Sequence, residues 1–211
     1  MKRVLRLFHF LAAFVAFLPW LAPAQQPASP GQFDYYLLSL SWSPEYCYSH
    51  RESPECSGAR HYGFIVHGLW PEFRNGGYPE HCSTEPGLRD PQSMLDIMPD
   101  MGLIQHEWTT HGTCSGLSAQ VYFSLIRQAF NSIEIPPRFV SPSHQQVASA
   151  IDIKMAFVQY NPKLTARDIR VSCERGYFRG VEICVTKDLR GIECPGGREC
   201  YDNRIRVAPV R

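Results

Sequence analysis

The segments His67-Gly68-Leu69-Trp70-Pro71-Glu72 and His106-Glu107-Trp108-Thr109-Thr110-His111-Gly112-Thr113-Cys114 decide the interpretation of this chain. Together they hold three of its eight histidines and two of its four tryptophans. Histidine is the side chain whose ordinary pKa lets it gain and lose a proton near neutral pH. Three histidines beside tryptophans and glutamates therefore predict acid–base chemistry on a substrate that presents a flat ring.

Strand-like and helix-like patterns surround the two segments. Aromatic residues and leucines interleaved with Ser39 and Ser41 predict a half-buried strand over residues 35–42. Further strands are predicted over residues 61–66, 169–173, 177–186 and 204–210, and helices over residues 118–133 and 143–160. Helices and strands are segregated along the chain, which predicts an α+β fold with a central antiparallel sheet flanked by helices.

Two local features add detail to this fold. Residues 46–62 contain two cysteines and many charges, which predicts a loop pinned by a disulfide. The pattern Thr165-x-x-Asp168 predicts a capping box on one short helical turn.

The N-terminal residues have the composition of an export signal. A basic start with Lys2, Arg3 and Arg6 precedes an apolar run over residues 7–21 and the small-residue site Ala22-Pro23-Ala24. This order predicts a signal peptide over residues 1–24, with an uncleaved signal-anchor as the alternative. Residues 25–211 then form a single catalytic domain, long enough to bury a sizeable core.

Removal of the signal peptide changes the charge balance. Three of the 21 basic residues leave and none of the 20 acidic residues does, so the remainder carries 18 − 20 = −2. Proteins that coat nucleic acid usually present a basic stripe, and this balance does not favour one. A nucleic-acid substrate would therefore be bound locally, through contacts with a few residues.

Eight cysteines follow the predicted signal peptide, an even number. In an exported chain this predicts four disulfides and an oxidising compartment, so the protein is expected to be secreted or periplasmic. Eight cysteines allow 105 pairings, and spacing alone does not choose among them. Zinc bound by cysteines is the competing interpretation, although the chain has no Cys-x-x-Cys pair.

The histidines of the second segment do not have zinc-protease spacing. On a helix Glu107 would lie over His111 and His106 over Thr110, because residues four apart share a face. His106 and His111 are five apart and would point about 140° apart around the axis. The zinc-protease motif needs histidines four apart. A metal site built from both and His67 remains an alternative.

General acid–base catalysis needs no metal and no cofactor. Cleavage of a ribose phosphodiester through its own 2′-hydroxyl requires a base, an acid and donors for the charge on phosphorus, and histidines can supply these. Trp70 and Tyr78 are candidates to stack on a nucleobase, and Glu72 to accept from its amine. Taken one at a time, each of these residues also fits an ordinary structural role.

The two segments resemble the active-site segments of the ribonuclease T2 family, which are secreted, transferase-type endoribonucleases. The resemblance extends to residues 38–47, 151–162 and 169–173, and covers most of residues 33–200. It implies an α+β fold around an antiparallel sheet. It also implies disulfides Cys47–Cys56, Cys82–Cys114, Cys173–Cys200 and Cys184–Cys194.

The resemblance assigns roles to individual residues. It implies that His111 is the general base and His67 the general acid in forming a 2′,3′-cyclic phosphate, with the roles exchanged in its hydrolysis. His106 would bind phosphate, and Glu107 would support the transition state and orient His111. Trp70, Glu72 and Tyr78 fall where the family builds its first base pocket.

The chain departs from the family pattern at two places. Thr110 stands where the family usually has a lysine, which predicts a slower enzyme unless another cation such as Arg74 takes its place. Leu103-Ile104 stands where an aromatic pair is common, which predicts weak preference for the base 3′ of the cut.

The sequence therefore predicts a metal-independent endoribonuclease of broad base specificity. It would act as a monomer on single-stranded RNA, without DNA or membrane partners. The first alternative is a catalytically weak secreted RNA-binding or toxin-like homologue. The second is a metallohydrolase.

Overall fold

The computed structural model describes residues 29–211, so the predicted signal peptide lies outside the described residues. Within them, no helix has the length and apolar composition needed to cross a membrane. The strands are β1 (Tyr35–Trp42), β2 (Phe64–Glu72), β3 (Gln146–Ala148), β4 (Ile169–Glu174), β5 (Tyr177–Val185) and β6 (Ile205–Val207). The α-helices are α1 (Ser43–Ser49), α2 (Pro54–Ser57), α3 (Met101–Thr110), α4 (Ala119–Asn131) and α5 (Ala150–Tyr160).

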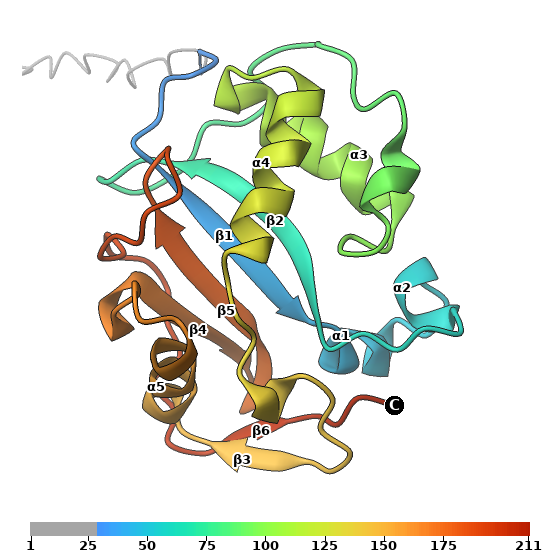
Figure 1. The fold of residues 1–211 in the computed structure, drawn as a ribbon, viewed down its shortest axis with the longest axis vertical. Helices are drawn as coiled ribbons and strands as arrows, with labels where there is room; N and C mark the ends of the chain where they lie inside the picture. Colours follow the sequence, from blue (N-terminus) through green and yellow to red (C-terminus); the bar gives the residue numbers. More distant parts are fainter. Residues whose placement is uncertain (1–28) are drawn as a thin grey trace, which may run out of the picture.

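The strands form one sheet in the order β2-β1-β5-β6-β3, and β4 pairs with β5. Every pairing is antiparallel except the single parallel contact between Tyr177 of β5 and Arg206 of β6. Helices α3 and α4 lie over the β1–β2 end of the sheet, and α5 lies beside β4 (Figure 1). The predicted α+β fold with a mainly antiparallel sheet and flanking helices is confirmed.

The core lies between the sheet and these helices. An aromatic cluster of Trp42, Phe64, Phe139, Phe157 and Phe178 joins β1, β2 and β5 to α5 through tilted, edge and stacked ring contacts. These rings bury large apolar areas, so they dominate the stability of this end of the molecule. The opposite face of the sheet carries a smaller cluster of Tyr35, Leu37 and Cys184, packed against Trp70.

Two predicted helices have different outcomes. The helix predicted over residues 118–133 is α4, which buries Tyr122, Phe123 and Ile126 against the sheet. The helix predicted over residues 143–160 is too long at its start, because Gln146–Ala148 pair with β6 as strand β3. Ser149 and Asp152 then form a capping box that begins α5 at Ala150.

The loop predicted over residues 46–62 is partly helical. It contains α2 and the end of α1, each with a proline in its first turn, and Cys47–Cys56 joins the two. Proline suits the first helical turn because the backbone N–H that it lacks has no partner there in any case. The predicted capping box of Thr165 and Asp168 is present on a single 3₁₀ turn.

Four disulfides join the pairs that the family resemblance implies. They are Cys47–Cys56, Cys82–Cys114, Cys173–Cys200 and Cys184–Cys194. No cysteine of the described chain is free, so none offers a thiolate to zinc. Cys82–Cys114 is the bond that ties the loop after β2 to the segment that follows α3.

Candidate active site

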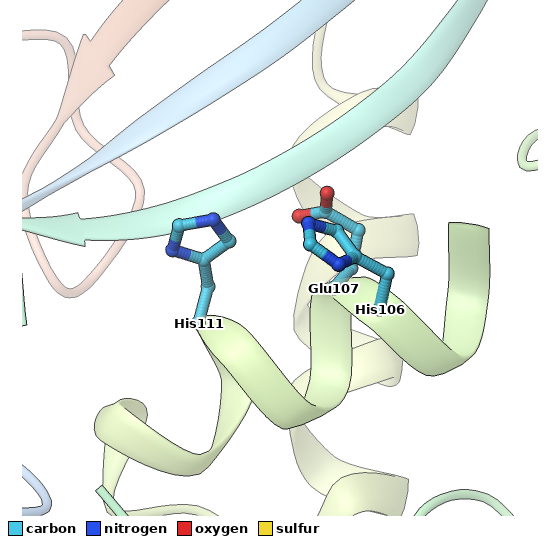
Figure 2. A group of neighbouring side chains, drawn as sticks. All are labelled: His106, Glu107 and His111. Atoms are coloured by element: carbon cyan, nitrogen blue, oxygen red, sulfur yellow. The ribbon is translucent and has the colours of Figure 1, made fainter. Parts of the chain in front are cut away.

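Helix α3 carries three of the predicted site residues toward strand β2. Asp100 caps its first turn, accepting hydrogen bonds from the backbone N–H groups of Gly102 and Leu103. The side chains of His106, Glu107 and His111 extend from α3 toward β2 (Figure 2). The helix ends at Thr110, and His111 adopts φ −111° and ψ −45°.

The two histidines at this end of the helix lie close together despite their five-residue spacing. The ring centroids of His106 and His111 are 6.3 Å apart. The backbone N–H of His111 still bonds to the Glu107 carbonyl, so the helical hydrogen bonding on which the 140° prediction rests extends to His111. The predicted stacking of His106 over Thr110 is present, with 3.5 Å between His106 Nδ1 and Thr110 Oγ1.

His67 stands at an irregularity of β2. Ser39 pairs with Gly68 and Leu40 with Val66, so His67 is an extra residue without a partner on β1. Such bulges redirect a side chain and are common beside active sites. The Ser41 hydroxyl lies 3.1 Å from His67 Nδ1, and His67 Nε2 lies 3.6 Å from Glu107 Oε1. Burial lowers the pKa of His67, and the charge of His106 lowers it further, although 43% of the side chain is exposed.

Glu107 is completely buried between α3 and β2. The Trp70 indole N–H donates to Glu107 Oε2 at 2.6 Å, and Oε1 has no hydrogen-bond partner among the described residues. Burial raises the pKa of Glu107 to about 8, against the opposing effect of the Trp70 bond. At neutral pH this carboxyl is therefore mostly protonated, and it can donate a hydrogen bond as well as accept one.

Gly68 makes this contact possible. A Cβ atom at Gly68 would collide with Glu107 Oε2 and with the Trp70 indole nitrogen. The position therefore tolerates only glycine while the Glu107–Trp70 bond is in place. Sequence reasoning did not identify Gly68 or Ser41 as site residues. The only signal for them was their place, within the first motif and among the apolar residues of the first strand.

The His111 ring is surrounded by aromatic side chains. Its ring centroid is 5.4 Å from those of Trp70 and Tyr78, and its Nδ1 has no hydrogen-bond partner among the described residues. Burial, followed by the charges of His106, His67 and His81, lowers the pKa of His111 to about 4. At neutral pH the ring is uncharged and able to accept a proton. The Glu107 side chain makes no hydrogen bond to it.

The three predicted base-binding residues lie on the same side of the site. Trp70 and Tyr78 flank His111, and Tyr78 is 50% exposed. Glu72 follows Trp70 by two residues on β2, so both side chains emerge on one face of the sheet. Burial raises the pKa of Glu72 to about 7, with Arg170 opposing and Glu182 adding to the rise.

The described residues include one group whose geometry suits a metal ion. Ligand atoms of His106, Glu107 and His111 lie within 4.8 Å of one another. Cys173, Cys200 and Asp202 also cluster, but the two cysteines are bonded to each other and are not ligands. The metal alternative for the histidine cluster therefore has to be tested by chelation.

Comparisons with known proteins place this chain in a family. The model of the ribonuclease T2 family matches residues 33–194. A ribonuclease of Aeromonas hydrophila is 38% identical over 143 residues, which cover 65% of this chain and 62% of that protein. A probable ribonuclease of Haemophilus influenzae is 32% identical over 180 residues, which cover 76% of this chain and 61% of that protein. The chain thus spans about three fifths of the length of these two relatives.

The fold has solved counterparts as well. The crystal structure of RNase NT in complex with 5′-AMP matches this chain with a TM-score of 0.66 at 24% identity. The match covers 84% of this chain and 98% of that one. With the family match over both histidine segments, these comparisons show that the chain belongs to the ribonuclease T2 family.

Proposed function

We propose that this protein is a metal-independent endoribonuclease that cuts single-stranded RNA by attack of the 2′-hydroxyl. The first step gives a 2′,3′-cyclic phosphate, and its hydrolysis gives a 3′-phosphate end. The observation that carries the proposal is the convergence of His67, Glu107 and His111 from a strand and a helix. Family membership supports the same reaction.

His111 acts as the general base. With a pKa of about 4 its ring is neutral in mildly acidic and neutral solution, so it accepts the proton of the 2′-hydroxyl. The 2′-oxygen then bonds to phosphorus. The flanking rings of Trp70 and Tyr78 fix the orientation of this base.

His67 acts as the general acid. It gives a proton to the 5′-oxygen as the bond between that oxygen and phosphorus breaks. The Ser41 hydroxyl at Nδ1 holds the ring so that Nε2 faces Glu107 and the reaction centre. In the second step the roles exchange, because water enters at the position that the 5′-oxygen has left. His67 then accepts a proton from the water, and His111 returns one to the 2′-oxygen.

Glu107 and His106 stabilise the charge on the phosphate. The protonated Glu107 carboxyl donates through Oε1, the atom without a partner in the structure. His106 is exposed beside it and contributes a donor from the solvent side. Donors that are oriented before the reaction are the main source of such catalysis.

The first base pocket lies between Trp70 and Tyr78, with Glu72 at its edge. The two rings stack on the base 5′ of the cut, and stacking accepts every base, which supports broad specificity. Glu72 gives some preference for a base with an amino group. A nucleotide complex is known for the RNase NT relative, which holds 5′-AMP.

We further propose that the protein acts outside the cytoplasm as a monomer, after loss of residues 1–24. Four disulfides in a chain of this size support an oxidising compartment. The predicted signal peptide supports export to the periplasm or the medium.

The test compares matched oligoribonucleotides and oligodeoxyribonucleotides with the disulfide-bonded protein in excess EDTA. We expect RNA to be cut to 2′,3′-cyclic phosphate and 3′-phosphate ends, and DNA to stay intact. His111→Gln should abolish cutting, and His144→Gln, which changes an exposed histidine in the bend before β3, should not.

Two results would overturn the proposal. Binding of RNA without any cleavage would support the alternative of a weak RNA-binding homologue, and Thr110 would be the first residue to revert to lysine. Loss of activity in EDTA with recovery on adding a divalent metal would support a metallohydrolase built on His106, Glu107 and His111.

A further inference from the structure

Buried polar atoms without hydrogen-bond partners lie both inside and outside the candidate active site. The described residues contain four: Glu107 Oε1, His111 Nδ1, Arg170 Nε and Glu55 Oε1. The first two belong to the site above. Arg170 Nε lies 3.3 Å from Glu182 Oε2, so the charge of this nitrogen is compensated by an ion pair. Glu55 has no such explanation.

Glu55 is a buried acid on helix α2. Only 7% of its surface is exposed, and burial raises its pKa. The nearby Ser43 hydroxyl opposes this rise, but Glu55 Oε1 has no hydrogen-bond partner among the described residues. A buried carboxyl without a partner is costly to keep, so a donor from a ligand is the natural complement.

The Glu55 side chain lines a cleft of about 520 Å³ between α1, α2, the residues before β2 and the end of the chain. This volume is in the range of pockets for small organic ligands. Tyr48 and Tyr62 line the cleft with aromatic rings, and Tyr48 is 78% exposed. Arg51 and Arg211 line it with positive charge. Rings, cations and a buried acceptor together suit a nucleotide.

The cleft and the first base pocket lie at opposite ends of β2. Trp70 and Glu72 are at the end of the strand, and Tyr62 precedes its start, with His67 between them. Ser41 contacts His67, and Ser43, two residues further along, already lines the cleft. Figure 1 places α1 and α2 beside the start of β2, below α3. The charge of Asp100, the cap of α3, also reaches Glu55.

The direction of the RNA follows from the proposed mechanism. His67 protonates the leaving 5′-oxygen, so the leaving strand departs from the His67 side of the phosphate. The base pocket at Trp70 holds the other side. A leaving strand that continues along β2 away from Trp70 arrives at the cleft.

We propose that this cleft is a subsite for a guanine nucleotide of the leaving strand, 3′ of the cut and beyond the first leaving base. The adjacent N1–H and N2–H donors of guanine match the two oxygens of the Glu55 carboxylate. Tyr48 stacks on the base, and Arg51 contacts a phosphate. This inference rests on the proposed endoribonuclease function.

The test uses oligodeoxynucleotides with a single ribonucleotide, so that only one bond can be cut. The tail 3′ of this bond is deoxyuridine of increasing length, and a single deoxyguanosine is moved along it. We expect KM to fall about tenfold when the guanosine reaches the subsite, the size of one good carboxylate–base pairing. Deoxyadenosine at that position should not have this effect, and kcat should not change.

Variants assign the effect to the cleft. Glu55→Gln should remove the response to guanosine and leave kcat/KM unchanged on the shortest substrate, which does not reach the cleft. Glu52→Gln changes an exposed glutamate of the same loop and should retain the response. Tyr48→Ala removes an exposed ring and should weaken binding of the long substrates, and it keeps the test valid if Glu55→Gln does not fold.

The possible outcomes separate this inference from the proposed function. A KM that is independent of tail length and base, with normal cleavage, overturns the subsite alone, as does a guanosine response that survives in Glu55→Gln. If no substrate is cut, the proposed function fails. Fluorescence anisotropy with the all-deoxy oligonucleotides then measures the guanosine preference of the wild type and Glu55→Gln directly.

Discussion

Gly68 determines how closely strand β2 approaches the buried acid of helix α3. Its missing side chain leaves the space in which Trp70 donates to Glu107. At the same strand, the unpaired position of His67 turns that ring toward the same carboxyl. Single residues of β2 thus set the distances on which the proposed chemistry depends.

Replacement of Gly68 tests this dependence. We expect Gly68→Ala to lower kcat about 100-fold, because an added Cβ displaces the Glu107–Trp70 pair and such misplacement is costly in catalysis. Gly58→Ala, whose new Cβ would meet only an ordinary contact with Pro54, is the control. Steady-state rates on a dinucleotide measure both, and an unchanged kcat in Gly68→Ala would show that this contact is not required.

The histidine pKa values predict an acidic optimum. Below about pH 4 His111 is protonated and cannot act as a base, and above the lowered pKa of His67 the acid has lost its proton. The pH profile of kcat/KM should therefore be bell-shaped, with its maximum between these limits and below pH 6.5. A maximum above neutrality would show that the two roles are wrongly assigned.

We predict that Thr110 limits the rate, because it stands where the family resemblance implies a lysine. Its side chain is buried, and its Oγ1 lies 3.5 Å from Nδ1 of His106, the residue proposed to bind the phosphate. Arg74, the alternative cation, follows the end of β2, where its backbone N–H bonds to Asp34. We expect Thr110→Lys to raise kcat about 100-fold, the lower end of the effect of one oriented donor.

The control for this gain is Thr109→Lys, which adds the same charge to the exposed face of the same helix. Single-turnover rates at saturating substrate distinguish the two variants. Equal effects of both would mean that net charge, and not position, limits the reaction.

At the scale of whole elements, α3 and the loop after β2 are held together by Cys82–Cys114. The bond closes 32 residues, and His81 in the same loop donates its backbone N–H to the Thr110 carbonyl at the end of α3. Cys47–Cys56 closes only 9 residues between α1 and α2, away from the histidines. The two bonds therefore have different expected effects.

Removal of each bond by paired Cys→Ala changes tests this difference. The loop-entropy relation predicts a loss of about 3.7 kcal/mol in the free energy of unfolding for Cys82–Cys114 and about 2.6 kcal/mol for Cys47–Cys56. Only the first loss should also reduce kcat, because Tyr78 and His81 lie in the released loop. Urea unfolding and turnover measure the two effects, and equal activity losses would contradict this assignment.

The whole molecule carries little charge with which to attract RNA. Residues 25–211 hold 18 basic and 20 acidic side chains. We therefore expect a weak salt dependence: log KM for single-stranded RNA against log salt should have a slope no steeper than about 2, which corresponds to a few phosphate contacts. A slope several times larger would contradict this expectation. It would indicate a locally basic RNA-binding surface whose charge is balanced by acidic residues elsewhere in the molecule.

The boundaries of elements show where the sequence alone was insufficient. Residues 143–160 have one helical period, yet the first of them form β3, because pairing with the distant β6 outweighs local preference. Residues 46–62 contain the end of α1 and the whole of α2. These helices are too short to show a helical period of apolar residues in the sequence. Both errors concern contacts that local patterns do not contain.

The sequence by itself supplied the residues on which the proposed chemistry depends. The identity and order of the candidate site residues and the even number of cysteines follow directly from side-chain types and their spacing. The site residues are His67, His106, Glu107 and His111. These properties are local, so they are readable without coordinates.

The tertiary structure decided the electrostatics and the geometry of the site. Only packing buries Glu107 and His111 enough to move their pKa values to about 8 and about 4. Only the β2 irregularity and the packing of α3 against β2 bring three histidines close to one carboxyl. The proposed roles of Gly68, Ser41 and Glu55 likewise depend on neighbours distant in sequence. Desolvation and close approach depend on what the folded chain places around a residue, and a linear pattern does not contain that information.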